Sequence, residues 1–317
     1  MRKRIKSTTF YKILRNINFL IKHDFQQELN DTRYEIETLK LMPLTTEILN
    51  YYKANPELSL DYKAELSYIR ENKAYITFPY KHLRSLGKIH SGYNKILKLP
   101  FVIHNNKKLY FPSTWSVKYA NDIYRNFIEN ENILGGAYRE KSPHQYQTGT
   151  FHIHKGDTLL DIGAAEALVS LDAIDKIKRL YLIESDPLWI EPLNATFRPY
   201  KEKVTIINKL ISDIDSDSTI TLASLLKNEE LSALFIKMDI EGYETSVIEA
   251  SKDVLSRAKD IRIACCTYHK HNDAAVLNSI FTALNYKTEY SDGYMLFTID
   301  ELKPPYFRKG IIRAEKE

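Results

Sequence analysis

The chain has 317 residues, 44% of them hydrophobic, and a formal net charge of +4. This composition is ordinary for a globular protein, and the length suits one large domain or two smaller ones. The basic surplus is too slight to indicate nucleic-acid binding by itself. The two cysteines, Cys265 and Cys266, are adjacent and point to opposite faces of a strand, so no disulfide is expected between them, and they lack the spacing of a zinc site.

Basic residues crowd the first 23 positions, where seven lysines and arginines precede Asp24. Apolar residues recur there at helical spacing and predict an amphipathic helix. We expect this helix to pack on the body of the protein, and the alternative is weak peripheral contact with an anionic membrane. No apolar run approaches the roughly 18 residues of a membrane-spanning helix. No signal peptide is apparent, so the expected location is the cytoplasm.

Residues 1–145 are expected to form a mainly helical N-terminal region that contributes a substrate-binding surface or a lid. A helix capped by Thr45 or Thr46 should end before Pro56, and a second helix should cover residues 60–72.

A strand is predicted at residues 74–78, and a hairpin at residues 101–111 with a polar turn at Asn105 and Asn106. Four large side chains then recur every four positions and predict one stripe of a helix that packs in the core: Trp115, Tyr119, Ile123 and Phe127.

Residues 133–150 contain glycines, a proline and many polar residues, and predict a loop between the two parts of the chain. Because loops often carry function, three residues of this loop are candidates to line a ligand pocket: Tyr138, His144 and Tyr146.

Residues 146–317 are predicted to form the second domain, in which short apolar runs alternate with helical stretches. This alternation predicts βαβ units and a mostly parallel α/β sheet covered on both faces. The predicted strands lie at 158–163, 180–185, 204–208, 233–239, 261–268, 286–290 and 294–300. Only three residues separate the last two, which should therefore form an antiparallel hairpin. Such a sheet is typical of S-adenosylmethionine-dependent methyltransferases.

The first strand of this sheet ends at Asp161-Ile-Gly163, where open α/β sheets bind ligands. Gly163 permits a sharp turn, and the helix after it offers free N–H groups. A dinucleotide fingerprint needs three glycines, whereas "GAAEALVS" has one, and Glu166 would repel a diphosphate. S-adenosylmethionine carries a positive sulfonium and ammonium, so these acids favour it over NAD. The candidate cofactor-binding residues here are Asp161, Gly163, Ala164 and Glu166.

The next two strands add further candidates. Glu184 ends an apolar strand and is placed to accept both ribose hydroxyls of a nucleoside. Asp186 and Trp189 follow it near the expected adenine position, although a helix-capping role is the expectation for Asp186. Ser212 and Asp213 follow the third strand, where they flank the adenine or form an ordinary turn.

The fourth strand ends in the sequence "KMDIEGYE", residues 237–244, which places Asp239, Glu241 and Glu244 within six positions. Crowded acids repel one another, so at least one carboxyl pKa should rise toward neutrality and suit a general base. The alternative is a helix start whose acids are stabilised by the helix dipole.

Four segments together resemble the FkbM family of S-adenosylmethionine-dependent methyltransferases: "GDTLLDIGAAEA", "LYLIESDP", "TITLASLL" and "FIKMDIEGYE". The resemblance covers about residues 140–300 and leaves the first 130 or so residues unassigned. It implies a Rossmann-like class I methyltransferase fold, with S-adenosylmethionine bound at Asp161, Gly163 and Glu184. It also implies methyl transfer to a hydroxyl oxygen, often of a sugar or natural product. The family usually has a second glycine where this chain has Ala167, which bears on how tightly the cofactor is held.

His269 and His271 follow the fifth strand, at the same edge of the sheet. Either histidine could serve as the base, because an unshifted histidine pKa lies near neutrality. Together with Asp239 they could also hold a metal, but we expect none.

The sequence therefore predicts an enzyme that methylates a hydroxyl of a sugar, glycan or small metabolite. The expected catalytic residues are Asp239, Glu241, Glu244 and His269. Three alternatives remain open: a non-catalytic binding module, a nucleic-acid methyltransferase and an NAD enzyme. Methyltransferases that act on nucleic-acid amino groups commonly carry an Asn/Asp-Pro-Pro-aromatic tetrad after the fourth strand, where this chain has "MDIE", so no nucleic-acid partner is expected.

Overall fold

The computed structural model describes residues 43–72, 77–80, 86–297 and 302–316. The basic amphipathic helix predicted at the start of the chain lies outside the described residues, as does most of the strand predicted at 74–78. Within the described ranges, no helix combines the length and the apolar character that crossing a membrane requires.

Seven strands form the central sheet, in the order β11-β12-β10-β9-β4-β5-β6. They are β4 (Thr158–Ile162), β5 (Arg179–Ile183), β6 (Val204–Ile207), β9 (Leu234–Met238), β10 (Ile261–Cys266), β11 (Lys287–Tyr290) and β12 (Ile311–Lys316). The five strands from β10 to β6 are parallel, whereas β12 runs antiparallel to both of its neighbours. The predicted parallel sheet with an antiparallel end is therefore confirmed.

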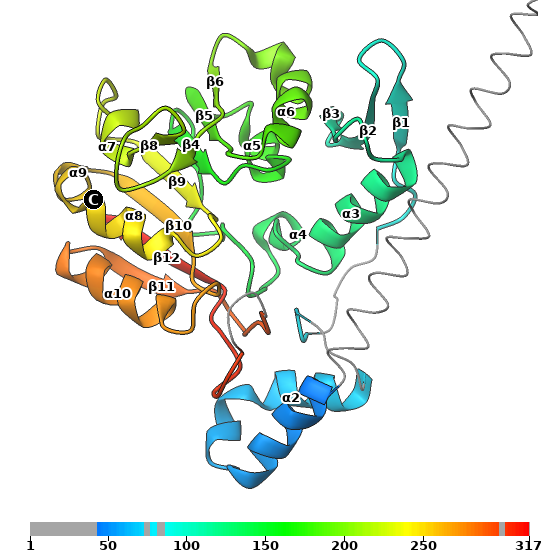
Figure 1. Ribbon diagram of the computed structural model, residues 1–317, viewed down its shortest axis with the longest axis vertical. Coiled ribbons are helices and arrows are strands. Elements are labelled where there is room, and N and C mark those ends of the chain that lie inside the picture. The colour runs from blue at the N-terminus through cyan, green and yellow to red at the C-terminus, as the bar shows by residue number, and fades with distance from the viewer. Residues whose placement is uncertain (1–42, 73–76, 81–85, 298–301, 317) are drawn as a thin grey trace, which may run out of the picture.

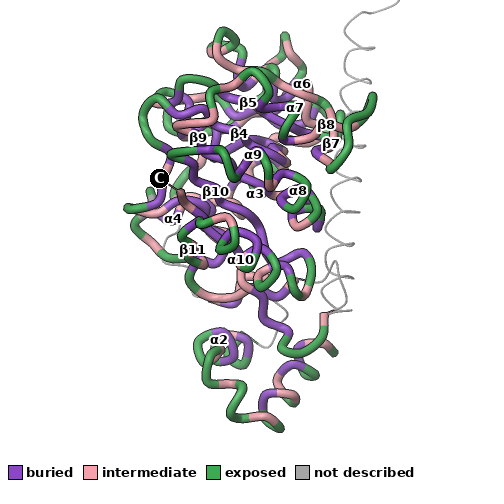
Figure 2. The backbone as a smooth tube through the Cα atoms, turned by 90° about the vertical axis from the view of Figure 1, so that its left-hand side faces the viewer, coloured by how far each residue is buried: buried purple, intermediate pink, exposed green. Residues whose placement is uncertain are grey.

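Helices cover both faces of the sheet, and the strands alternate between two hydrophobic clusters. Leu159 belongs to the cluster under α5 (Leu168–Ala173) and α6 (Ile190–Phe197), whereas Leu160 belongs to the opposite cluster. That opposite cluster is covered by α8 (Glu244–Ala250), α9 (Lys252–Arg257) and α10 (Asp273–Ala283). Cys266 and Cys265 divide in the same way and remain free thiols, as their adjacency predicts. Figure 2 shows the buried backbone concentrated in these strands.

One predicted strand of the antiparallel end is wrong. The partner of β11 is β12, and not residues 294–300. The described part of that segment forms a single bridge, between Met295 and Arg308, because its side chains are used elsewhere. Met295 packs in the main core, and Leu296 packs against the N-terminal helices.

The predicted hairpin is present within a small three-stranded sheet of β1 (Ser91–Asn94), β2 (Leu99–His104) and β3 (Lys107–Tyr110). Its turn is at Asn105 and Asn106, with φ angles of 46° and 65°, the left-handed conformation that short hairpin turns require. The predicted helix follows as α3 (Val117–Glu129), and a short α4 (Gly135–Tyr138) interrupts the loop predicted at 133–150.

The helical stripe packs as expected, because Trp115, Ile123 and Phe127 lie against the main hydrophobic cluster. Trp115 precedes α3, whose N-cap is Ser116. That cluster also joins Val102 of β2 to Leu159 of β4, so the core is continuous across the boundary predicted at residue 145. The division of the chain at this position stays a prediction.

The N-terminal helices form a lobe beside the sheet (Figure 1). A helix spans residues 43–54 and ends before Pro56 as predicted, but it already includes Thr45 and Thr46, so neither residue begins it. A 3₁₀ turn, η1 (Leu58–Tyr62), leads into α2 (Lys63–Asn72). The lobe packs through Tyr52 and other buried residues on Phe307, in the connection between β11 and β12.

Candidate functional site

A cavity of about 400 Å³ lies where the carboxyl ends of β4, β5 and β9 meet. This is the edge at which open α/β sheets bind ligands, and the volume suits a small molecule. Six residues predicted from the sequence line it: Gly163, Glu184, Asp186, Trp189, Asp239 and Glu241. The lining also includes Ala165, Ser185 and Lys209, which sequence reasoning missed.

Gly163 makes the sharp turn at the end of β4. Its φ is +74°, and a Cβ at this position would lie 1.7 Å from the carbonyl oxygen of Asp239. The close approach is therefore between two strand ends. The Gly163 carbonyl also accepts a hydrogen bond from Lys237 Nζ at 2.8 Å. Further along the same turn, Ala167 has a φ of +60°, so it keeps the backbone conformation that favours glycine although the glycine is missing.

Glu184 is held at the end of β5 by the backbone. Its Oε2 accepts a hydrogen bond from Ala165 N at 2.8 Å, and its Oε1 accepts one from Asp186 N at 2.7 Å. These bonds explain how a carboxylate can be buried after an apolar strand. Each carboxylate oxygen keeps acceptor capacity for a ligand hydroxyl in the cavity.

Asp186 and Trp189 also line the cavity. Asp186 Oδ1 accepts a hydrogen bond from Leu188 N at 2.9 Å and caps the 3₁₀ turn η2 (Pro187–Trp189), which confirms its expected capping role. Trp189 meets Trp115 edge to face, with 5.4 Å between ring centroids. The N-terminal region thus supports one wall of the cavity.

Asp161 lies inside the core and does not line this cavity. Its carboxylate pairs with Lys237 at 2.9 Å and accepts a hydrogen bond from Ser170 Oγ at 2.6 Å. The strand register places Asp161 opposite Lys237, so the pair joins β4 to β9. Burial opposes the charge of Lys237, but Asp161 and Asp239 outweigh it and raise the pKa of Lys237. The structure therefore places Asp161 in the core between β4 and β9, and its contribution to cofactor binding stays a prediction.

Six more candidates do not line the cavity: Ala164, Glu166, Ser212, Asp213, and the two predicted catalytic residues Glu244 and His269, which are buried. Glu166 is buried, and burial raises its pKa to about 8. Ser212 follows β7 (Leu210–Ile211), and its backbone N–H donates to Ile220, in β8 (Thr219–Ile220). The residues that line the cavity in this segment are instead Lys209, Leu210 and Ile211.

Asp239 is the centre of a hydrogen-bonded cluster at the end of β9. Tyr146 OH donates to its Oδ2 at 2.9 Å, and Tyr268 OH donates to its Oδ1 at 3.2 Å. Burial opposes ionisation, but the neighbouring His144 and Lys237 cations outweigh it and lower the pKa of Asp239. The expectation that crowding would raise an acid's pKa is wrong for Asp239, because cations and hydroxyl donors surround it.

His144 joins Asp239 to a residue that the sequence did not indicate. Its Nδ1 lies 3.0 Å from Glu131 Oε2, and its Nε2 lies 3.7 Å from Asp239 Oδ2. Burial disfavours the imidazolium, but Asp239 and Glu131 outweigh it and raise the pKa of His144 to about 9. His144 and Tyr146 therefore contact Asp239, but neither lines the cavity, so the prediction that they would line a ligand pocket is wrong. The side chain of Tyr138 lies outside the described part of the structure.

His269 faces the same carboxylate from the other side. Its Nδ1 lies 2.7 Å from Glu244 Oε1, and its Nε2 lies 3.5 Å from Asp239 Oδ1 and 3.6 Å from Glu241 Oε2. Burial alone would lower the pKa of His269, but these three carboxylates, led by Glu244, raise it. Burial, together with Asp239 and Glu244, raises the pKa of Glu241, so the expected upward shift occurs there.

Two groups of side chains have spacings that could hold a metal ion: His144 with Asp239 and Cys266, and Asp239 with Glu244 and His269. Carboxylates raise the histidine pKa in each group, and a histidine must lose its ring proton to become a metal ligand. The second histidine near Asp239 is His144 and not His271, which has no described contact with this cluster.

No protein-family model and no curated protein matches the chain. Among solved structures, the chain is similar to the methyltransferase FkbM from Methylobacillus flagellatus KT, with 19% identity over 62% of this chain and 54% of that one and a TM-score of 0.42. The chain thus spans about half the length of that protein. The chain is also similar to the precorrin-6y C5,15-methyltransferase from Geobacter metallireducens, with 17% identity over 52% of this chain and 83% of that one and a TM-score of 0.37. A third similar structure is TrmK of M. capricolum, solved with S-adenosylhomocysteine, with 13% identity over 52% of this chain and 64% of that one and a TM-score of 0.33.

The fold is the Rossmann-like fold of class I methyltransferases. The strand order identifies this fold, because β12 lies between β10 and β11, antiparallel to both, beside five parallel strands.

Proposed function

We propose that this chain is an S-adenosylmethionine-dependent methyltransferase of the FkbM type. Its acceptor would be a hydroxyl group of a sugar, glycan or small metabolite. The observation that supports the proposal best is the charge of the cavity, which four carboxylates and one lysine line: Glu184, Asp186, Asp239, Glu241 and Lys209. Such a lining attracts a sulfonium cation and repels a diphosphate.

The cavity residues suit the parts of this cofactor. Glu184 would accept the ribose hydroxyls, and Trp189 with Ile211 would contact the adenine. Asp239 would lie toward the sulfonium end, where its hydroxyl donors and imidazolium neighbours keep it ionised. When bound, the cofactor supplies an electrophilic methyl group.

The chain itself would position the acceptor and receive its proton. A carboxylate with a lowered pKa is a weak base, so Asp239 is better suited to electrostatic support than to proton removal. His269 is the stronger candidate, because its Nδ1 lies 2.7 Å from Glu244 Oε1 while its Nε2 lies near the Asp239 and Glu241 carboxylates, which line the cavity. The cavity would hold the acceptor oxygen toward that methyl group, and the acceptor proton would pass to the cluster of Asp239, Glu241 and His269, in which Nε2 lies behind the two carboxylates that line the cavity.

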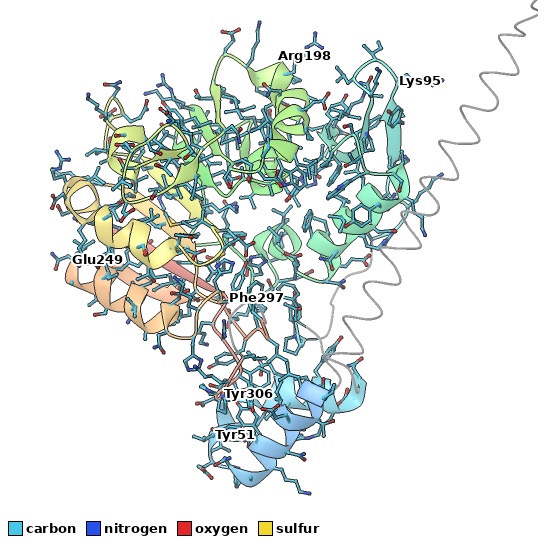
Figure 3. The ribbon with its side chains drawn as sticks, viewed as in Figure 1. Tyr51, Lys95, Arg198, Glu249, Phe297 and Tyr306 are labelled. Carbon is cyan, nitrogen blue, oxygen red and sulfur yellow. The ribbon has the colours of Figure 1, made fainter. Side chains whose placement is uncertain are left out.

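Turnover tests the proposal directly. Purified protein is incubated with S-adenosylmethionine labelled on the methyl carbon and a panel of sugars and glycans, and labelled product and S-adenosylhomocysteine are measured. We expect product with wild-type protein and with Glu249→Gln, an exposed acid on α8 (Figure 3), and none above background with Asp239→Ala. Equal turnover by Asp239→Ala would contradict the role of the cluster. Transfer only to nucleic acid would replace the proposed acceptor.

A further inference from the structure

A second cleft, of about 370 Å³, lies between the three-stranded sheet and the segment formed by α6 and η3 (Arg198–Tyr200). Three cations line it, namely Lys107, Lys108 and Arg198, and none of the described residues that line it is acidic. Its charge is therefore opposite to that of the first cavity. The side chain of Arg198 lies at the same end of the molecule as Lys95, in the turn between β1 and β2 (Figure 3).

The three cations differ in how far the protein neutralises them. Lys107 pairs with Asp175 at 2.8 Å, and Lys108 lies over the Phe101 ring, 4.8 Å from its centroid. Arg198 is exposed and forms no ion pair or hydrogen bond with any described residue. An arginine without a partner can offer its paired N–H donors to a phosphoryl group, and Lys108 can add a second charge.

The remaining lining suits a small organic ring. Tyr200 is half-buried and lines the cleft beside Arg198, and Asn106 is exposed at the hairpin turn with an amide that both donates and accepts. The enclosed volume is that of a small-molecule site. A flat surface for a polymer would be wider and would need more unpaired cations.

We propose that this cleft is a second ligand site, which binds the phosphoryl group of a small phosphorylated molecule such as a sugar phosphate. Arg198 and Lys108 hold the phosphoryl oxygens, and Tyr200 and Asn106 contact the ring. The helix α6 connects this site to the first cavity, because Trp189 lies just before its first residue and Arg198 just after its last. Eight helical residues rise about 12 Å, so the two sites are separate.

Calorimetry with two probes tests this site: glucose 1-phosphate, and inorganic phosphate as the phosphoryl group alone. We expect both probes to bind the wild-type chain, and glucose 1-phosphate to bind more tightly because Tyr200 and Asn106 contact its ring. Arg198→Gln should weaken both by about tenfold or more, since it removes charged hydrogen bonds. Arg70→Gln, an exposed arginine of α2 far along the chain, is the matched control and should leave both affinities unchanged.

Lys108→Gln provides a second variant with the same expected direction, and circular dichroism checks that each variant is folded. The titrations are repeated with S-adenosylhomocysteine present, which should leave phosphate binding in place because the cleft is separate from the first cavity. Failure of the methyltransferase proposal would therefore not affect this result. No binding of either probe, equal binding by Arg198→Gln, or binding only of a single-stranded oligonucleotide would overturn the proposal.

Discussion

Asp239 shows how neighbours decide what a single carboxylate can do. Three acids stand close together in the sequence, yet the pKa of Asp239 falls while that of Glu241 rises. The difference comes from residues that are distant in sequence, because Tyr146, Tyr268 and His144 all direct donors at Asp239. A local motif can therefore place a cluster of acids without assigning their protonation states.

The pH dependence of turnover tests His269 as the base. Its pKa is raised above the usual 6.5, so we expect the rate to increase with pH and to level off above the raised pKa, where the ring is neutral. Glu244→Gln removes the carboxylate that contributes most to the upward shift and should move the profile to lower pH. His269→Asn should abolish this dependence and lower kcat by about 10²-fold or more.

Glu249→Gln, on the same helix but exposed, should leave the profile of turnover against pH unchanged. A profile that is the same in wild type and His269→Asn would exclude His269 as the titrating group.

The stabilising contribution of His144 should be present at low pH and lost at high pH, whereas a carboxylate with a lowered pKa loses its contribution at low pH. Its folded pKa of about 9 lies above the unfolded value of 6.5, so its contribution is complete below about pH 6.5 and disappears as pH rises through 9. The contribution is roughly 3 kcal/mol at most. Urea unfolding at pH 6 and pH 9.5 should show a much larger deficit for His144→Gln at pH 6. His90→Gln, an exposed histidine, should show none, and a deficit for His144→Gln that is equal at both pH values would contradict the charged state of this ring.

At the scale of elements, β4 and β9 gave a clear sequence signal because the sheet buries them on both faces, although the half-exposed β6 and β11 were predicted as well. Residues 158–162 and 234–238 are buried throughout, so they stand out as apolar runs. The strand at 311–316 was missed because it carries Arg313, Glu315 and Lys316, and the more apolar segment at 294–300 was preferred. That preference failed because Leu296 packs on helices more than 200 residues earlier in the chain.

The sequence predicted the site residues that end strands, but it did not predict the contacts that depend on which strands and loops become neighbours. Gly163, Glu184 and Asp239 were found because each ends a predicted strand, and strand ends meet at one edge of a parallel sheet. The ion pair between Asp161 and Lys237 could not be predicted without knowing that β4 and β9 are neighbours in the sheet. Glu131 gave no signal at all, because its partner His144 matters only once the loop has folded under β9.

Gly163→Ala tests the junction between β4 and β9. The new Cβ would meet the Asp239 carbonyl at 1.7 Å with φ at +74°, so both a clash and a strained backbone are expected. We expect a loss of about 3 kcal/mol in the free energy of unfolding, measured by urea denaturation. Gly149→Ala is the matched control, because nothing lies within 4 Å of its Cβ position, and it should change stability little. Similar losses for both variants would show that the close approach is absent.

Across the whole molecule, charge separates two concave sites. Carboxylates dominate the cavity at the end of the parallel strands, whereas cations line the cleft beside the small sheet. The hydrophobic core that includes Val102 and Leu159 runs continuously between the two regions, so the N-terminal elements support the cavity as well as the cleft. The net charge of +4 hides this division, because it averages over both.

The account depends on the acidic cavity accepting a cationic methyl donor, and calorimetry measures this most directly. Wild-type protein should bind S-adenosylmethionine and S-adenosylhomocysteine but not NADH, and Glu184→Gln should bind both about tenfold or more weakly, because it removes a charged acceptor for the ribose hydroxyls. No heat with either compound on folded protein, or tighter binding of NADH, would contradict the account.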